Sequence, residues 1–196
     1  MKRVVLLFCL LALAGTSFAG FSIGFKQVEM PTYVDDGSMF TMDMNLLRIG
    51  AMASPEFRIE GYIGYAKETY EWEEGTETVQ LDGSAYAFGA GGYYVIELPA
   101  NTSFSIGLQF LYASSSSEYE NVEGPSTTSY CIDPLMRVDF AIPGAERLAF
   151  FAEYGGRYAS ATTTVEVTGA DDIEYKWNGL QTYAPDNILA GLYYVF

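Results

Sequence analysis

The side chains of this 196-residue chain that could do chemistry are hydroxyls and carboxylates, because the sequence contains no histidine. Serine is abundant, with an unbroken run from Ser114 to Ser117, but a serine hydroxyl becomes nucleophilic only beside a general base. Two carboxylates could act as acid and base, yet acidic residues in polar loops are usually solvated surface charges. We therefore expect no catalytic residue, no cofactor and no enzyme.

Charged residues also occur inside segments that have strand character. They alternate with apolar or aromatic positions, as Arg58 does with Phe57 and Ile59. Buried charges persist only when they are paired and hydrogen-bonded, and three cations and three anions balance here. We interpret them as a structural polar network in the lumen of a barrel, with a selectivity or gating network as the alternative. The six residues are Arg58, Glu60, Arg137, Asp139, Glu153 and Arg157.

Eight strand-like segments position these residues, separated by alternately short and long connections. Three tight connections, 53–56, 98–101 and 143–146, carry the Pro, Gly or Asn that turns require. Short turns at one end and long polar loops at the other are typical of outer-membrane barrels. The sequence therefore predicts an all-β, eight-stranded antiparallel up-and-down transmembrane β-barrel, with the fifth and seventh segments continuing above the membrane. The segments are 20–30, 40–52, 57–69, 84–97, 102–114, 129–142, 148–162 and 186–196, and the long loops are about 31–39, 70–83, 115–128 and 163–185.

Alternation along each segment also indicates which face points inward. In the fifth segment, Phe104, Ile106 and Leu108 share one face, opposite Ser105 and Gly107. A soluble lipocalin-like barrel turns its apolar face inward, whereas a membrane barrel turns it outward. Large aromatics on one face and glycines on the other favour the membrane barrel, since eight strands enclose little space. A soluble secreted lipocalin-like binder is the alternative.

The second segment is less regular. Asp43 and Asn45 share a face, whereas Arg48 lies on the opposite one. This change of parity predicts a β-bulge near Arg48. Pro134, inside the sixth segment, indicates a second bulge.

Both ends of the chain indicate export to a bacterial outer membrane. Lys2 and Arg3 precede an apolar run that leads to the small-x-small site Ser17–Ala19, which predicts a signal peptide over 1–19 and a barrel domain over 20–196. At the other end, every second residue counted back from Phe196 is apolar, as in a last membrane strand. An even number of strands places both termini in the periplasm. Cys131 is the only cysteine after residue 19, so no intrachain disulfide is expected.

On these residues the chain resembles the small eight-stranded outer-membrane barrels of the OmpA and OmpX type. The most specific motif is the C-terminal assembly signal, a polar residue followed by x-Gly-x-x-aromatic-x-aromatic. Gly191, Tyr194 and Phe196 occupy its last three fixed positions, and Leu189 stands where a polar residue is usual. The resemblance implies recognition by the barrel-assembly machinery and a location among outer-membrane lipids. Nothing follows Phe196, so no peptidoglycan-binding domain is expected, and we expect a monomer.

Charge completes the functional expectation. Without Lys2 and Arg3 the chain has 8 basic and 25 acidic residues, which argues against nucleic acid as a partner. Many acidic residues fall in the second and fourth long loops, without the spacing of a calcium loop. We expect a non-enzymatic integral outer-membrane barrel that contributes to envelope integrity or, through its acidic extracellular loops, to adhesion to a surface or host ligand. A narrow channel for small or apolar solutes is the alternative.

Overall fold

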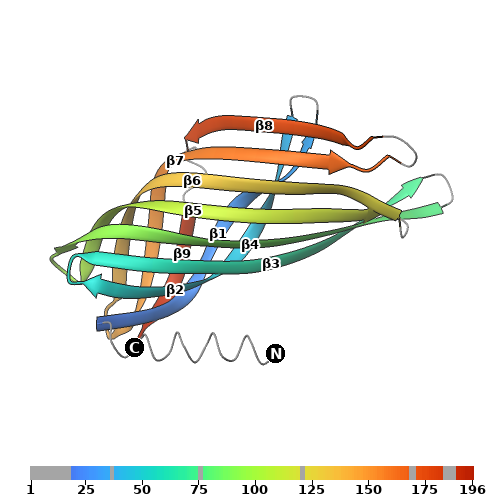
Figure 1. Ribbon diagram of the computed structural model, residues 1–196. Helices are drawn as coiled ribbons and strands as arrows, with labels where there is room; N and C mark the ends of the chain where they lie inside the picture. Colours follow the sequence, from blue (N-terminus) through green and yellow to red (C-terminus); the bar gives the residue numbers. More distant parts are fainter. Residues whose placement is uncertain (1–18, 36–37, 75–76, 120–121, 168–170, 183–188) are drawn as a thin grey trace, which may run out of the picture.

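The computed structural model describes residues 19–35, 38–74, 77–119, 122–167, 171–182 and 189–196. These residues form nine β-strands (Figure 1). None of them belongs to a helix that could cross a membrane. The predicted signal peptide falls, except for Ala19, outside the described residues. The strands are β1 (Ala19–Asp35), β2 (Ser38–Ser54), β3 (Phe57–Glu74), β4 (Glu77–Leu98), β5 (Thr102–Tyr119), β6 (Val122–Ile142), β7 (Ala145–Val165), β8 (Ile173–Thr182) and β9 (Leu189–Val195).

Eight of these strands close into a ring. Consecutive strands from β1 to β7 pair antiparallel, and β9 pairs with both β1 and β7. Tight turns at Pro55–Glu56, Pro99–Asn101 and Pro143–Gly144 join the strands at one end, as expected. Ala100, Asn101 and Gly144 have positive φ, which these turns require. The predicted eight-stranded antiparallel barrel is confirmed.

The eighth position beside β7 is shared by two strands. β8 pairs with the upper part of β7, ending at Gly156↔Thr182, and β9 pairs with the lower part, from Glu153↔Leu189. The two pairs are three residues apart on β7, from Glu153 to Gly156, but seven residues apart on the partner side, from Thr182 to Leu189. β9 covers residues 189–195 of the predicted last strand, 186–196, of which 186–188 lie outside the described residues, and the predicted loop 163–185 contains a strand. The β-branched and aromatic residues Ile173, Tyr175 and Trp177 explain why this polar segment pairs.

The other long loops are also mostly strand, contrary to the prediction. The β3–β4 ladder continues from Phe57↔Tyr94 up to Glu74↔Glu77, and Figure 1 shows this hairpin reaching far beyond the closed ring. Polar cross-strand pairs hold it there: the Thr69 hydroxyl donates to Asp82 over 2.7 Å. Polar residues were assigned to loops, but strands that stand in water can be polar on their outer face. The predicted extension of the fifth and seventh segments is confirmed.

The β1–β2 hairpin leaves the ring in the half that is farther from the tight turns, which we call the upper half. The β1–β9 ladder ends at Lys26↔Gly191 and the β2–β3 ladder at Leu46↔Gly64. Above these pairs the hairpin lies against the opposite wall, where the Ser129 hydroxyl donates to the carbonyl of Pro31 over 3.1 Å. Figure 1 shows β1 and β2 turning away from the direction of β3 to β7. We call residues 27–35 and 38–46 the inner hairpin.

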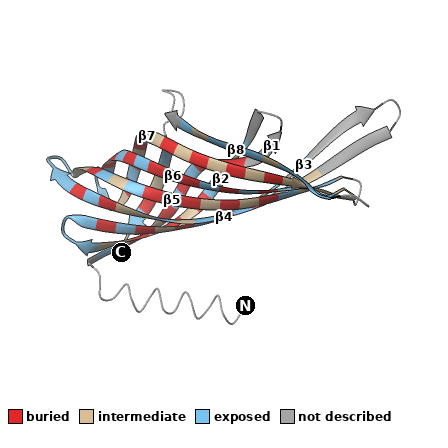
Figure 2. Ribbon diagram, turned by 45° about the horizontal axis from the view of Figure 1, so that its top comes forward, coloured by how far each residue is buried: buried red, intermediate tan, exposed pale blue. Residues whose placement is uncertain are grey.

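Two regions result. The lower barrel is the closed ring between the tight turns and these pairs. The upper sheet is formed by the six strands β3–β8 beyond these pairs. Figure 2 shows buried and exposed residues alternating along the strands in both. The kind of buried residue changes between them. In the lower barrel Lys26 is buried beside exposed Phe25, whereas in the inner hairpin Val28 and Met30 are buried and Gln27 is exposed.

The predicted β-bulges are wrong. The β1–β2 register is unbroken through Gly24↔Arg48, and Arg48 points inward together with Met44 and Leu46. Asp43 and Asn45 are exposed, so the strand keeps its parity while its polar face changes from inside to outside. Pro134 lies opposite Leu108 in a continuous β5–β6 ladder. The β6–β7 register is also the same on both sides of Pro134.

Candidate functional site

The six charged residues predicted to line the lumen are all buried, the most exposed being Arg58 at 6%. They project from β3, β6 and β7, at positions that alternate with the exposed apolar residues of those strands. The structure brings five of them into one cluster of ion pairs and places Arg157 in a neighbouring pair.

Arg137 is the centre of the cluster. Its Nη1 lies 2.9 Å from Glu60 Oε1 and 3.5 Å from Glu153 Oε1, and its Nη2 lies 2.5 Å from Asp139 Oδ1. Its guanidinium also stacks on the ring of Phe151, 3.8 Å from the centroid. One cation therefore pairs with three anions from three strands, in the fork geometry that suits arginine and carboxylates.

Glu60 is the second branch point. Its carboxylate pairs with Arg48 as well as Arg137, and Arg58 Nε lies 2.9 Å from its Oε1. The Tyr62 hydroxyl donates to its other oxygen over 2.5 Å. This carboxylate therefore meets three cations and one phenol, which satisfies a buried anion.

Arg157 forms a separate pair with Asp133, through Nε–Oδ1 at 2.8 Å and Nη2–Oδ2 at 2.7 Å. It also donates to the backbone carbonyl of Glu29 in the inner hairpin. Gln109 connects this pair to the cluster, because it donates to Asp133 over 3.0 Å and accepts from Lys26 Nζ over 2.6 Å.

Sequence reasoning missed several members of this network. Lys26 pairs with Glu153, and Arg48 pairs with Glu60. The alternation along β1 does contain a signal for Lys26. It follows Ser22 and Gly24, which face inward, in steps of two residues, whereas Phe25 lies on the outer face. The expected balance of three cations and three anions was therefore incomplete. Among the described buried residues there are five cations and four anions: Lys26, Arg48, Arg58, Arg137 and Arg157 against Glu60, Asp133, Asp139 and Glu153.

Aromatic rings contribute to the environment of these cations. The Arg48 guanidinium carbon lies 4.2 Å from the centroid of the Tyr193 ring, a favourable cation–π distance. Tyr93 is fully buried, and its hydroxyl lies 2.8 Å from that of Tyr62. The ring faces thus compensate part of the cationic excess.

An apolar cluster lies above the charged network. Met44 and Leu46 of the inner hairpin pack against the small residues Ala85, Ala113 and Ala159 of the upper sheet. Cys131 is buried in this cluster as a free thiol. The lumen therefore contains a layer of ion pairs below a layer of apolar side chains.

The part of the chain that the structure describes contains no group of three or more acidic, cysteine or histidine side chains placed to hold a metal ion. Of the predicted acidic loop residues, Asp186 lies outside the described residues, and so do the side chains of Glu68, Glu71, Glu73, Glu74 and Glu77.

The predicted assembly-signal residues lie on β9 and at the C-terminus. Gly191 faces inward under Phe151, where an added Cβ would lie 2.3 Å from Phe151 Cζ. Tyr194 and Phe196 face outward, with their rings edge to face at 5.1 Å. Their role in assembly stays a prediction.

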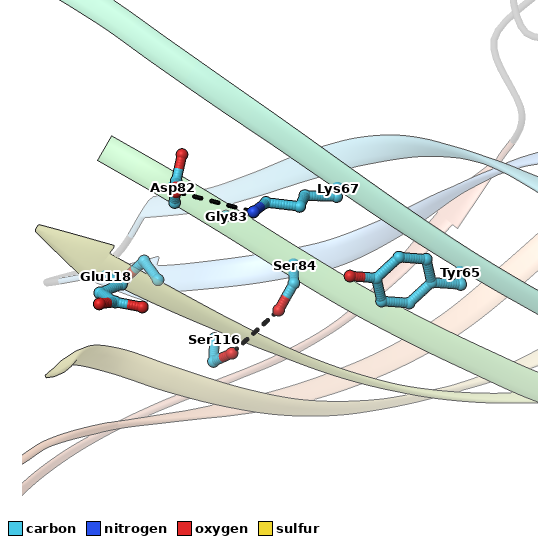
Figure 3. A pocket seen from close by; sticks show the side chains of 8 residues that line it. Tyr65, Lys67, Asp82, Gly83, Ser84, Ser116 and Glu118 are labelled. Carbon is cyan, nitrogen blue, oxygen red and sulfur yellow. Dashed lines mark hydrogen bonds and ion pairs between the residues drawn. The ribbon is translucent and has the colours of Figure 1, made fainter. Parts of the chain in front are cut away.

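A second candidate site is a groove of about 150 Å³ on the outer face of β3, β4 and β5 (Figure 3). Tyr65 lies at one end of the groove. Next to it, Lys67 Nζ lies 3.7 Å from Asp82 Oδ2. The hydroxyls of Ser84 and Ser116 are 3.2 Å apart. We call it the outer groove, and it is lined by Tyr65, Lys67, Asp82, Gly83, Ser84, Ser116, Ser117 and Glu118.

Comparison with known proteins identifies the fold. No protein-family model matches the sequence, and no curated protein matches it either. Neisserial surface protein A (NspA) is similar in structure, with a TM-score of 0.50 and 16% identity over 90% of this chain and 97% of that one. The chain thus has the fold of the eight-stranded outer-membrane barrels of the OmpA and OmpX type.

Two other solved structures match with lower scores. A major outer membrane protein from Thermus thermophilus has a TM-score of 0.48 and 14% identity, covering 90% of this chain and 98% of that one. Ail, the attachment invasion locus protein of Yersinia pestis, has a TM-score of 0.45 and 16% identity, covering 90% and 97%.

Proposed function

We propose that the protein is a non-enzymatic integral protein of the bacterial outer membrane, whose upper sheet is displayed for interaction at the cell surface. The observation that supports this most is the reversal of faces in the lower barrel, where charges are buried and large apolar side chains are exposed. In water that arrangement would be unstable, because apolar surface is buried when water surrounds a protein. A bilayer around the lower barrel removes the conflict.

The exposed apolar residues form a continuous belt around the ring. Phe25, Ile63 and Leu108 are 61%, 58% and 56% exposed, and neighbouring strands carry similar residues at the same height. Aromatic pairs lie towards its lower limit, such as Phe57↔Tyr94 and Phe140↔Phe150. An apolar band with aromatic residues at its margins is typical of a transmembrane barrel.

A fractionation experiment tests this location against a soluble lipocalin-like binder. We expect the protein in the outer-membrane fraction, with migration in gel electrophoresis that changes on heating. Recovery of folded protein in the periplasm or medium would contradict the proposal. Cleavage of the signal peptide after Ala19, both termini in the periplasm, recognition of Gly191, Tyr194 and Phe196 by the assembly machinery, and a monomeric state belong to the same proposal.

The alternative of a narrow channel is tested by conductance. The ion-paired layer and the apolar cluster above it both occupy the lumen, so we expect no steady pore in planar bilayers. A reproducible unitary conductance from the purified barrel would favour the channel. A change of its ion selectivity in Arg58→Ala would then assign the network a selectivity role.

The upper sheet supports the surface role. β3 continues to Glu74, but among the described residues its ladder with β2 ends at Gly64, which leaves one backbone edge of the strand open. An open edge can accept a strand from a partner. The exposed Asp171 and Asp172 make the β7–β8 connection, at the other edge of the upper sheet, acidic. A surface role is also what the name of the Neisserial protein describes for that protein.

Shortening the hairpins tests this role. Residues 71–80 are replaced by Asn-Gly, a turn that fits the Tyr70↔Leu81 pair, and residues 165–173 are replaced in the same way at Thr164↔Glu174. We expect both variants to reach the outer membrane and to lose adhesion to a host or bacterial surface. Unchanged adhesion in both would contradict the surface role and leave envelope integrity as the function.

A further inference from the structure

The outer groove is built from consecutive rows of cross-strand neighbours. The first row is the aromatic pair Tyr65↔Tyr86. The next row, one outward position higher, contains Lys67, Ser84 and Ser116, and the third contains Thr69, Asp82 and Glu118. The outer surface of these three strands thus changes from aromatic to hydroxyl and then to carboxylate within a few residues.

This sequence of rows places the outer groove at the height of lipid headgroups, an inference that depends on the bilayer position proposed above. The row below the tyrosines carries exposed Ile63 and Phe88, which belong to the apolar belt. Tyrosine is favoured where a hydrocarbon layer meets water, because its ring is apolar and its hydroxyl is polar. The first molecules that meet Lys67 and Ser84 from outside are therefore the headgroups of the outer leaflet.

The side chains of the groove suit a sugar better than a phosphate. Tyr65 is 67% exposed and offers a flat apolar face. Beyond it, the hydroxyls of Ser84 and Ser116 can both donate and accept. Two carboxylates, Asp82 and Glu118, accompany the single cation Lys67, which is already paired with Asp82. An excess of anions disfavours a phosphate, whereas hydroxyl groups donate readily to carboxylates.

We propose that the outer groove binds a sugar ring in the headgroup of an outer-leaflet glycolipid. The apolar face of the ring stacks on Tyr65. Its hydroxyls donate to Asp82 and Glu118 and exchange hydrogen bonds with Ser84 and Ser116. A few convergent polar groups beside an aromatic wall are what small-molecule sites use to fix orientation. The groove would thereby hold a lipid at a defined place on the barrel.

Native mass spectrometry of the full-length mature protein tests this proposal. The protein is reconstituted in nanodiscs that contain equal amounts of glucosyl diacylglycerol and phosphatidylglycerol with matched acyl chains, and the lipids retained on release are counted. We expect the glucosyl lipid to be retained in preference. Tyr65→Ala should reduce the preference about fivefold, and the double variant Ser84→Ala, Ser116→Ala about threefold or more.

Tyr94→Ala is the matched control, because Tyr94 is an exposed tyrosine of the lower aromatic margin and its loss should leave the preference unchanged. No preference in the wild type, or an equal loss in Tyr94→Ala, overturns the proposal. A preference for phosphatidylglycerol that Lys67→Ala removes overturns it in favour of a phosphate site. Competition by methyl glucoside at concentrations equal to that of the lipid would also overturn it, since the ligand would then be a free saccharide.

Membrane recovery and heat-modifiable migration are measured for every variant. If the wild type fails these two tests, the proposed membrane location fails. If the wild type passes them but shows no preference for the sugar lipid, only the present inference fails.

Discussion

The lower barrel and the upper sheet share strands β3 to β7 but differ in the residues that they bury, which are charged around Arg137 and apolar around Leu111. In the lower part of β5, Gln109 is buried and Leu108 is exposed. A few residues further on, Leu111 and Ala113 are buried and Ser116 is exposed. The alternation of a strand therefore defines two faces, and the surroundings decide which of them is turned inward.

The two cores also depend on different forces. In the proposed location, burial of Leu111 or Met30 is favourable because water surrounds the upper sheet. In that location, hydrocarbon around the lower barrel is as apolar as the side chains and provides no such drive, so the interior of the lower barrel depends on ion pairs and hydrogen bonds. These specify a geometry at a high desolvation cost and tolerate the loss of a partner badly.

The largest effect that could break this comparison is expected for Arg137→Ala. It leaves Glu60, Asp139 and Glu153 without their shared cation, and removal of one partner from a buried pair costs about 3–5 kcal/mol of the free energy of unfolding. Urea titration in detergent, followed by heat-modifiable migration, measures this loss. Arg147→Ala at an exposed position is the control. Equal stability of the two variants would mean that the ion pairs do not hold the lower barrel together.

A second test places the boundary between the regions. Leu108→Arg puts a charge into the belt, and an arginine facing lipid near the bilayer centre costs about 2–4 kcal/mol. Ser116→Arg, on the same face of β5 above the belt, should cost at most about 1 kcal/mol. Folding yield into lipid vesicles and unfolding in urea give both values. If Ser116→Arg were as costly as Leu108→Arg, the outer groove would lie in hydrocarbon.

A third test compares adjacent residues of β2. Leu46 is fully buried in the apolar cluster, so Leu46→Ala leaves a cavity and should cost about 2–3 kcal/mol. Leu47 lies on the outer face, and its truncation removes only lipid contacts. Hydrogen exchange should show faster exchange of the inner hairpin in Leu46→Ala while the lower barrel stays protected. Slower or unchanged exchange there would mean that the inner hairpin does not rely on this cluster.

Much of the fold could be predicted because the lower barrel follows one rule over most of its length. Turns, strand count and the inward direction of residues such as Arg58 and Asp139 follow from tight connections and two-residue periodicity. The rule fails in the upper sheet and the inner hairpin. The mixed polarity of Asp43, Asn45 and Arg48 predicts a bulge, whereas the strand is regular and its polar face changes from inside to outside.

The candidate site was harder to predict for a related reason. Arg137 and Glu153 are predictable because each alternates with a clear run of outward apolar residues, such as Met136 and Tyr154. Lys26 and Asp133 lie near the level at which the stripe changes face, so their inward direction was less evident. The pairing of partners also depends on the shear of the barrel, which brings Lys26 beside Glu153 from strands that are distant in sequence. Spacing within one strand contains no information about that pairing.

The smallest of the expected effects tests how completely the lower barrel is filled. An added Cβ at Gly107 would lie 2.3 Å from Cδ1 of Tyr93 and 2.6 Å from the carbonyl oxygen of Gly92. Tyr93 is fully buried and bonded to Tyr62, so Gly107→Ala must displace a ring that belongs to the network, at a cost of about 1–2 kcal/mol. At Gly61, on the outer face, an added Cβ would meet no atom within 4 Å. Gly61→Ala should therefore be neutral or slightly stabilising, since it removes freedom from the unfolded chain. Equal urea midpoints for the two alanine variants would show that the lumen beside Tyr93 has spare room, and the channel alternative would regain support.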